Sequence, residues 1–334
     1  MSRNPTPNEA IVAARAPRYT SIDLLKASGI IVVIWIHAFQ EFGTTEALII
    51  RRLAFLTRFA VPAFFFASGF LYASGRPLPL QEFVTRRLVR LLVPYLVASL
   101  LALGFRHFIF SEQITGRQAA FELAIGAAWG VYYFVPLLLG ATIVGQGIFR
   151  FRSLAWPLFA LFWVLGLLSE MSIIAFDGFF WQIRSPFLWW GYFFAGWVVA
   201  PHFATLEQLT ALRRRRIGIA ALAVAVTVFL CYVLALQSSW SPQMAALGYV
   251  GIYSIIGGLF MLTLGSSAMP AVRWLSEATY PIYLYHYFII AAVHHWLAPP
   301  LRNPAAFVLG VAGSVGIVHG GRKVLGRYAR LLIG

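Results

Sequence analysis

Residues 21–39 read SIDLLKASGIIVVIWIHAF, an apolar run long enough to cross a bilayer as a helix. Three ionisable residues interrupt this run, namely Asp23, Lys26 and His37. An ionisable group inside a bilayer is costly unless it is paired or faces a polar cavity, so such residues are candidates for function. The stretch therefore predicts a membrane helix that carries part of a functional site.

The rest of the chain is equally apolar. Of its 334 residues 60% are hydrophobic and 11% are charged, whereas a soluble domain carries about 25% charged residues. We therefore expect an all-α, polytopic membrane bundle of about ten spans. The expected spans lie near 21–42, 53–75, 88–110, 128–149, 154–170, 186–202, 217–237, 246–265, 276–298 and 305–321. Residues 119–131 are apolar but too short to form a further span, and they predict a surface or re-entrant segment.

The distribution of basic residues predicts how the bundle lies in the membrane. With a cytoplasmic N-terminus, eighteen Lys and Arg residues fall in inner segments and six in outer ones, while Lys26 and Arg58 fall within helices. This asymmetry predicts that both termini are cytoplasmic. The chain then divides into an N-terminal tail of residues 1–20, a transmembrane domain of residues 21–321 and a basic tail of residues 322–334. Because the charges spread over every inner loop, the net charge of +15 does not indicate nucleic-acid binding.

Lys26 and His37 are the first candidates for chemistry. They are eleven residues apart, so a helix places them on nearly the same face, about 16 Å apart along its axis. A neutral imidazole is a natural general base for a hydroxyl group, and Glu41, four residues further on, can orient its ring. The alternative is structural, with His37 hydrogen-bonded inside the bundle and Asp23 and Lys26 forming an interfacial ion pair. The residues alone leave both interpretations open.

Arginines form the second group of candidates. Arg87 and Arg90 are three residues apart on one helix face at the predicted inner surface, beside Arg86. Guanidinium groups bind phosphates through two parallel hydrogen bonds, although anchoring to lipid headgroups is the simpler explanation for these three residues alone. Arg58, in the second expected span, is another intramembrane charge, unless its side chain reaches the outer interface.

The ninth expected span, LSEATYPIYLYHYFIIAAVHH from residue 275, contributes further polar residues. Tyr283 and His286 share a face of this helix, and Glu277 precedes them. No group of histidines, cysteines or acidic residues in the chain has the spacing of a metal site, so no metal is expected. The sequence also lacks a glycine-rich phosphate loop and the G-x-S-x-G motif.

Four stretches occur in a fixed order along the chain: SIDLLKASGIIVVIWIH, RFAVPAFFFASGFL, RRLVRLLVPY and ATYPIYLYH. This ordered set resembles the acyltransferase-3 family of integral membrane O-acyltransferases, which modify cell-surface glycans and related hydroxyl compounds. The segment YYFVPLLL at residues 132–139 is similar to an aromatic-aromatic-Leu segment of that family, with Val in place of Leu. Each motif is weak by itself, and the specificity lies in their order.

The resemblance implies roles for several residues. His37 matches the family's essential first-helix histidine, and Lys26 matches its basic partner. Arg87 and Arg90 match the arginine pair associated with the acyl-CoA donor, and we include the adjacent Arg86 with them.

The resemblance also implies the substrates. Tyr133, within the YYFVPLLL segment, is included with the donor-binding residues. The expected donor is acetyl-CoA or another acyl-CoA. The expected acceptor is an extracytoplasmic glycan or lipid-linked saccharide, modified at a bacterial cytoplasmic membrane.

These expectations combine into a mechanism. The acyl-CoA thioester enters the bundle from the inner side, and the acceptor hydroxyl enters from the outer side. His37, oriented by Glu41, removes the hydroxyl proton, and Lys26 or Arg58 stabilises the oxyanion. Two alternatives remain. One is a transporter or export partner in which Lys26, Arg58 and His37 form a substrate or proton path, and the other is a non-catalytic assembly protein.

Overall fold

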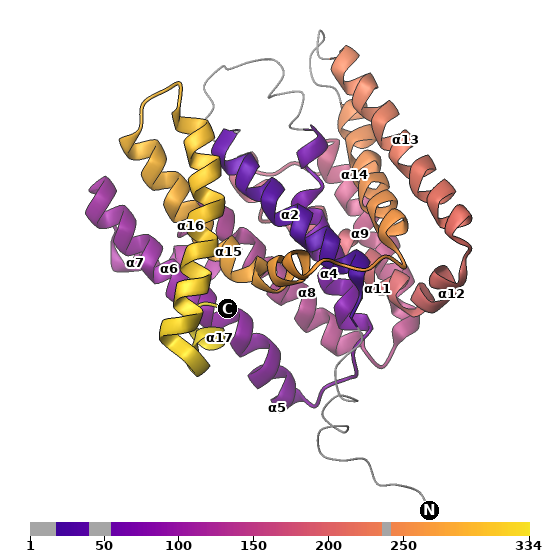
Figure 1. The fold of residues 1–334 in the computed structure, drawn as a ribbon, viewed down its shortest axis with the longest axis horizontal. Helices are drawn as coiled ribbons and strands as arrows, with labels where there is room; N and C mark the ends of the chain where they lie inside the picture. The colour runs from indigo at the N-terminus through magenta and orange to yellow at the C-terminus, as the bar shows by residue number, and fades with distance from the viewer. Residues whose placement is uncertain (1–17, 40–54, 236–241) are drawn as a thin grey trace, which may run out of the picture.

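The computed structural model describes residues 18–39, 55–235 and 242–334, which form helices joined by short loops (Figure 1). No β-strand occurs in these ranges, so the expected all-α fold is confirmed. The main helices are α2 (Thr20–Phe39), α4 (Ala60–Ala73), α6 (Val89–Phe110), α8 (Phe134–Ile148), α9 (Ala155–Glu170), α11 (Pro186–Val199), α13 (Ala211–Ala235), α14 (Pro242–Thr263), α15 (Pro270–Trp296) and α16 (Arg302–Leu325). The short helices are α5 (Leu80–Phe83), α7 (Gly116–Ile125), α10 (Gly178–Gln182), α12 (Phe203–Gln208) and α17 (Ala329–Leu332).

Each of the ten expected spans corresponds to a main helix, but only eight segments of the described chain are long and apolar enough to cross a membrane. The two exceptions are α11 and α15. Helix α11 has only 14 residues, and α15 is rich in tyrosine and histidine, which lower its hydropathy. Both helices bury much of their surface against other helices, so neither needs the continuous apolar surface that lipid demands.

The short apolar segment expected at residues 119–131 does not span the membrane. Most of it belongs to α7, a helix of ten residues that follows α6. The Thr115 side chain accepts a hydrogen bond from the Gln118 backbone N–H and caps the start of α7. Gly126, with φ of 71°, ends it. A helix of ten residues is too short to cross a bilayer, as expected, and the surface or re-entrant position stays a prediction.

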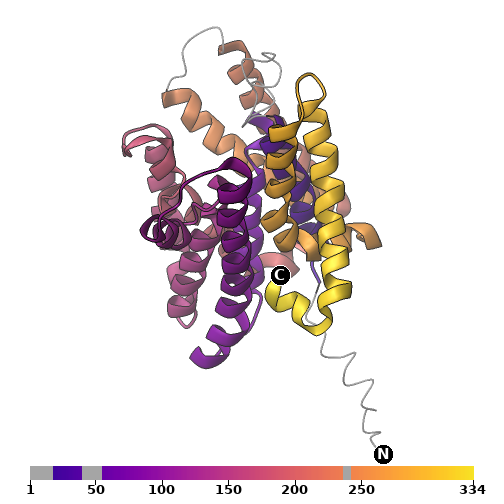
Figure 2. The ribbon, with the colours of Figure 1, turned by 90° about the vertical axis from the view of Figure 1, so that its left-hand side faces the viewer.

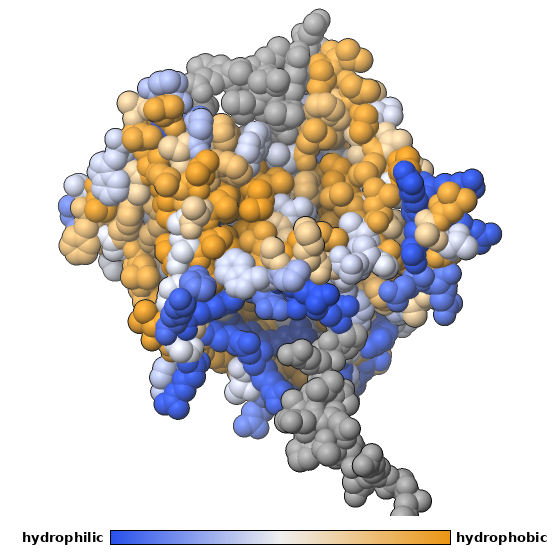
Figure 3. Space-filling model, viewed as in Figure 1, coloured by the Kyte–Doolittle hydropathy of each residue, from blue (hydrophilic) through white to orange (hydrophobic). Residues whose placement is uncertain are grey.

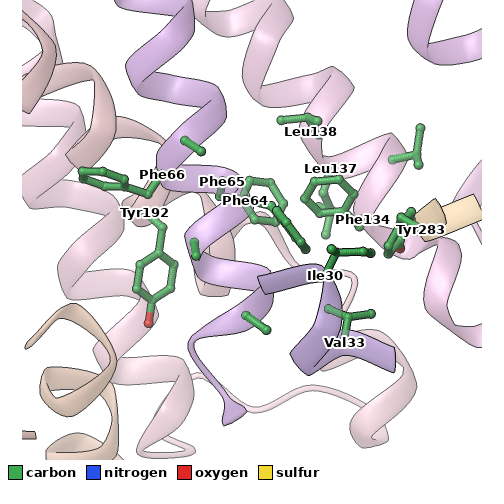
Figure 4. Close-up of a cluster of buried hydrophobic side chains, with 14 of the residues drawn as sticks. Ile30, Val33, Phe64, Phe65, Phe66, Phe134, Leu137, Leu138, Tyr192 and Tyr283 are labelled. Atoms are coloured by element: carbon green, nitrogen blue, oxygen red, sulfur yellow. The ribbon is translucent and has the colours of Figure 1, made fainter. Parts of the chain in front are cut away.

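The centre of the bundle is formed by α2, α4 and α15, with α2 packed against both of the others (Figures 1 and 2). Aromatic side chains fill the space between them. In Figure 4, Phe64 of α4 lies beside Ile30 of α2 and Phe134 of α8, whereas the Phe66 ring contacts the ring of Phe260 of α14. Consecutive residues of α4 therefore join different neighbouring helices into one core.

Helices α4 and α11 approach so closely that their backbones touch. A Cβ atom added at Gly69 would lie 1.9 Å from the Phe193 carbonyl oxygen, and one added at Gly196 would lie 2.0 Å from the Phe66 carbonyl oxygen. Lipid supplies no hydrophobic force between helices, so membrane bundles depend on such close packing of small residues. The two glycines therefore fix the position of α4, which lines the site described below.

On the face that Figure 3 shows, the middle of the bundle is apolar, and hydrophilic residues gather along the lower edge over α5 and α17 and at the right over α12. We call the lower edge the basic end of the bundle, because Arg86, Arg87 and Arg90 directly follow α5, and Arg327 and Arg330 lie beside and within α17. At the other end, Arg106 is neutralised by ion pairs with Glu112 and Glu122. The topology stays a prediction, in which this basic end faces the cytoplasm.

Candidate active site

Lys26 and His37 both face α15, as their spacing predicts. Lys26 lines a cavity together with Ser276 of α15. The His37 ring lies 5.4 Å from the His286 ring and 5.5 Å from the Tyr287 ring, measured between centroids. One interface between α2 and α15 therefore holds both candidates at different depths.

The cavity beside Lys26 has a volume of about 190 Å³. Its apolar wall comes from three other helices and consists of Phe64, Leu71, Leu91, Phe134 and Leu138. Tyr283 of α15 also lines the cavity, and Figure 4 shows it close to Phe64 and Phe134. Within the described part of the chain, no hydrogen bond or ion pair engages the Lys26 ammonium group. The cavity thus combines an apolar wall with a cation, and its volume suits a short acyl group.

Asp23 forms its ion pair with Arg18 and not with Lys26. Arg18 Nε donates to Asp23 Oδ2 over 2.7 Å, and Ser276 Oγ donates to Asp23 Oδ1 over 2.6 Å. Arg18 Nη1 also donates to Glu277 Oε1 over 2.6 Å. The interfacial Asp23–Lys26 pair considered in the structural alternative is therefore wrong. Arg18 joins α2 to α15 and satisfies Asp23, which leaves the Lys26 charge to the cavity.

His286, opposite His37, is fully buried. Its Nδ1 lies 2.8 Å from the Tyr283 carbonyl oxygen and 3.2 Å from the Ile282 carbonyl oxygen, both one turn earlier in α15. Its ring also contacts the ring of Tyr283, with centroids 5.9 Å apart. Tyr283 therefore links the cavity to the histidine pair, because it lines the cavity and its ring contacts that of His286.

Arg87 is positioned at the basic end by stacking on Tyr72. The centre of its guanidinium group lies 4.4 Å from the centroid of the Tyr72 ring. The Tyr72 hydroxyl donates to Gln146 Oε1, and Gln146 Nε2 donates to the Leu78 carbonyl oxygen over 2.7 Å. Leu91, four residues after Arg87 on the same helix face, lines the cavity. Arg87 therefore lies about one helical turn from the cavity wall.

The three neighbouring arginines differ in their partners. Arg86 forms an ion pair with Glu82 over 3.1 Å. Arg87 and Arg90 form no ion pair within the described ranges, and Arg90 is exposed. Of the arginines included with the donor site, Arg87 and Arg90 are thus the two whose charges remain available to a phosphate.

Arg58 belongs to a different part of the bundle. Its Nη2 donates to both carboxylate oxygens of Glu170, over 2.6 and 2.8 Å. Its Nη1 lies beside Gly248 of α14. These neighbours are on α9 and α14, whereas the cavity and the two histidines lie against α15. The structure thus does not place Arg58 with Lys26 and His37.

Two further predicted residues lie elsewhere. Tyr133 stands at the start of α8 and its ring contacts Trp189, with centroids 5.5 Å apart. Gln146, which holds the Tyr72–Arg87 stack, is thirteen residues further along that helix, a distance of about 20 Å. Tyr133 is therefore not part of the arginine site. Glu41 lies outside the described residues.

His286 and Tyr72 are the site residues to which sequence reasoning gave no role. The sequence showed that Tyr283 and His286 share a face, but not that this face meets His37. For Tyr72 the available signal was its position at the end of the second span, close in sequence to the arginines that follow.

The geometry can be compared with known proteins. A family model described as an acyltransferase domain matches residues 19–319. The chain matches no curated protein and no solved structure. The matched range includes the cavity, the two histidines, Arg87 and Arg90.

Proposed function

Because the chain belongs to the acyltransferase-3 family and is a multi-pass membrane enzyme of acyl transfer, we propose that it O-acylates a glycan or lipid-linked saccharide outside the cytoplasm. The donor in this proposal is an acyl-CoA, with acetyl as the first acyl group to test. One observation carries the proposal. The cavity beside Lys26 lies between free arginine charges at the basic end and His37 at the other end of α2.

The donor is assigned to the basic end. Coenzyme A carries several phosphates, and Arg87 and Arg90 offer guanidinium groups that no described carboxylate neutralises. The positive-inside rule places this end in the cytoplasm, where acyl-CoA is made. The acyl arm then extends past Leu91 into the cavity, where Phe64 and Phe134 form an apolar wall. This division leaves His37 for the acceptor.

The acceptor is assigned to the opposite side. Its hydroxyl loses a proton to His37 while its oxygen bonds to the acyl carbon. The bond from that carbon to sulfur then breaks, and the coenzyme A thiolate leaves and takes up the proton. The reacting carbon lies beside Tyr283, between His37 and the Lys26 ammonium, which stabilises the negative charge developing on the thioester oxygen. Arg58 has no part in this role, because Glu170 holds its guanidinium.

The test uses inverted membrane vesicles that contain the protein and acetyl-CoA labelled in the acetyl group. We expect base-labile label in the glycan fraction with the wild type and none with His37→Ala. His295→Ala is the matched control, since His295 is an exposed histidine near the end of α15. Label retained in His37→Ala would overturn the assignment of the base.

The same assay tests the donor and the sidedness. Succinyl-CoA replaces acetyl-CoA in a parallel reaction, and the more active donor identifies the acyl group. Sealed right-side-out vesicles should take up no label, because acyl-CoA cannot then reach the basic end. Equal labelling in both orientations would contradict the proposed topology, and no ester from either donor would contradict the proposed substrates.

A further inference from the structure

His286 carries a buried nitrogen that no described residue satisfies. Its Nδ1 faces two backbone carbonyl oxygens, which only accept hydrogen bonds. Nδ1 therefore holds the proton of the neutral ring, and Nε2 is left as an acceptor. Nε2 is fully buried and has no hydrogen-bond partner within the described part of the chain. Buried polar atoms in native proteins almost always have a partner, so this one requires an explanation.

His37 is the group placed to supply that partner. The two rings are 5.4 Å apart between centroids and inclined by 39°. Two imidazole nitrogens that point toward each other across this separation come within hydrogen-bond distance, so rotation of the half-buried His37 ring can supply the contact to Nε2. The Tyr283 ring also contacts His286, but its hydroxyl donates to the Val131 carbonyl oxygen instead.

We propose that His286 is a positioning residue for acyl transfer, whose Nε2 accepts a hydrogen bond from the imidazole N–H of His37. This inference rests on the proposed role of His37 as the base. The backbone of α15 fixes the His286 tautomer, and His286 in turn fixes that of His37. The second nitrogen of His37 then carries its lone pair toward the acceptor hydroxyl. A base oriented by a third group is a recurring arrangement in group-transfer enzymes.

The hydrogen bond between His37 and His286 acts both when His37 takes up the acceptor proton and when His37 gives that proton to the thiolate. The acceptor proton moves to the second nitrogen of His37, the acceptor oxygen bonds to the acyl carbon, and the carbon–sulfur bond breaks. The resulting imidazolium keeps its other N–H on His286, which stabilises the positive charge. When the thiolate of coenzyme A takes the new proton, His37 returns to its starting tautomer.

Two amide substitutions separate this role from simple packing. The amide of His286→Gln reaches the position of Nε2 and offers an acceptor oxygen there, whereas that of His286→Asn reaches only the position of Nδ1. We expect His286→Asn to lower kcat about 100-fold, the upper range for loss of an orienting group, with an unchanged KM for acetyl-CoA. We expect His286→Gln to keep at least about a tenth of kcat by the same reasoning. His295→Asn is the control on the same helix.

The activities of these variants distinguish the positioning role from the proposed function. Equal activity of the Asn and Gln variants, whether high or low, overturns the acceptor role of Nε2. Loss of activity in His37→Ala with full activity in His286→Asn overturns this inference and leaves the proposed function intact, while activity retained in His37→Ala overturns the proposed base. The hydrogen bond can also be detected without an activity assay, by NMR, as a correlation between two imidazole nitrogens in ¹⁵N-histidine-labelled protein. It should disappear in either His37→Ala or His286→Asn, and its absence from the wild type overturns the proposal.

Discussion

The guanidinium of Arg87 lies 4.4 Å from the centre of the Tyr72 ring, and Tyr72 is held by a hydrogen bond to Gln146. The stack joins the basic end to α4 and α8, the helices that supply Phe64 and Phe134 to the cavity wall. A flexible arginine side chain loses conformational freedom when its guanidinium group binds a phosphate. The stack reduces that loss by ordering Arg87 before the donor arrives.

Replacing Tyr72 should therefore weaken donor binding. A cation–π contact of this kind contributes about 1 kcal/mol, so we expect Tyr72→Leu to raise the KM for acetyl-CoA about fivefold. Tyr72→Phe keeps the ring and loses only the bond to Gln146, so its effect should be smaller. Tyr328→Leu removes the ring beneath Arg327 and serves as the control. An unchanged KM in Tyr72→Leu would contradict the role of the stack.

The three neighbouring arginines should respond unequally to removal. Hydrogen bonds to charged groups contribute about 1.5–3 kcal/mol, so Arg87→Ala and Arg90→Ala should each raise the KM for acetyl-CoA by about 10- to 100-fold. Arg86→Ala should change it less than about twofold, because Glu82 already neutralises Arg86 and the loss of an exposed ion pair has little further effect.

Kinetic measurements with acetyl-dephospho-CoA, which lacks the 3′-phosphate, identify the donor phosphate that each arginine contacts. An arginine bound to that phosphate should show little further effect when the truncated donor is used. If the KM values of Arg87→Ala and Arg90→Ala match that of Arg86→Ala with both donors, lipid headgroups are favoured as the partners of these arginines.

Asp23 should stabilise the contact between α2 and α15. It accepts hydrogen bonds from Arg18 and from Ser276, and it is almost fully buried. Asp23→Ala leaves both donors without their acceptor, so we expect a loss of about 1–3 kcal/mol in the free energy of unfolding. Thermal unfolding in detergent measures it. Asp177→Ala, at a loop position with no side-chain cap bond to α10, is the control and should unfold like the wild type.

The sequence predicted those features that depend on the geometry of a single helix. Lys26 and His37 share a face because eleven residues complete just over three full turns, and α15 indeed lies against both. The arginines of the basic end follow from the positions of charges along the chain. Membrane spans are also readable where they face lipid, whereas α11 and α15 face protein and so depart from the usual length and hydropathy.

Contacts between distant parts of the chain were not predictable in this way. Asp23 and Lys26 are three residues apart, which is compatible with an ion pair, but Arg18 and Ser276 engage Asp23 instead. The intramembrane charge of Arg58 was visible, yet its partner Glu170 lies 112 residues away. The pairing of His37 with His286 likewise depends on how α2 and α15 pack.

The contact between α4 and α11 gives the last prediction, which concerns the support of the site. A methyl group at Gly69 would collide with the backbone of Phe193, and one at Gly196 would collide with the backbone of Phe66. Backbone cannot rotate away as a side chain can, so the helices must separate. We expect Gly69→Ala and Gly196→Ala each to lower the free energy of unfolding by at least about 1–3 kcal/mol. Thermal unfolding of the purified protein in detergent measures the effect.

The matched control is Gly104→Ala on α6, where an added Cβ would meet nothing within 4 Å. This change should be neutral or slightly stabilising, because alanine loses less conformational freedom than glycine on folding. The double variant Gly69→Ala with Gly196→Ala should cost less than the sum of the single changes, since each already separates the same two helices. A Gly69→Ala protein as stable as Gly104→Ala would show that α4 and α11 do not touch through their backbones, and the position assigned to the cavity wall would then be wrong.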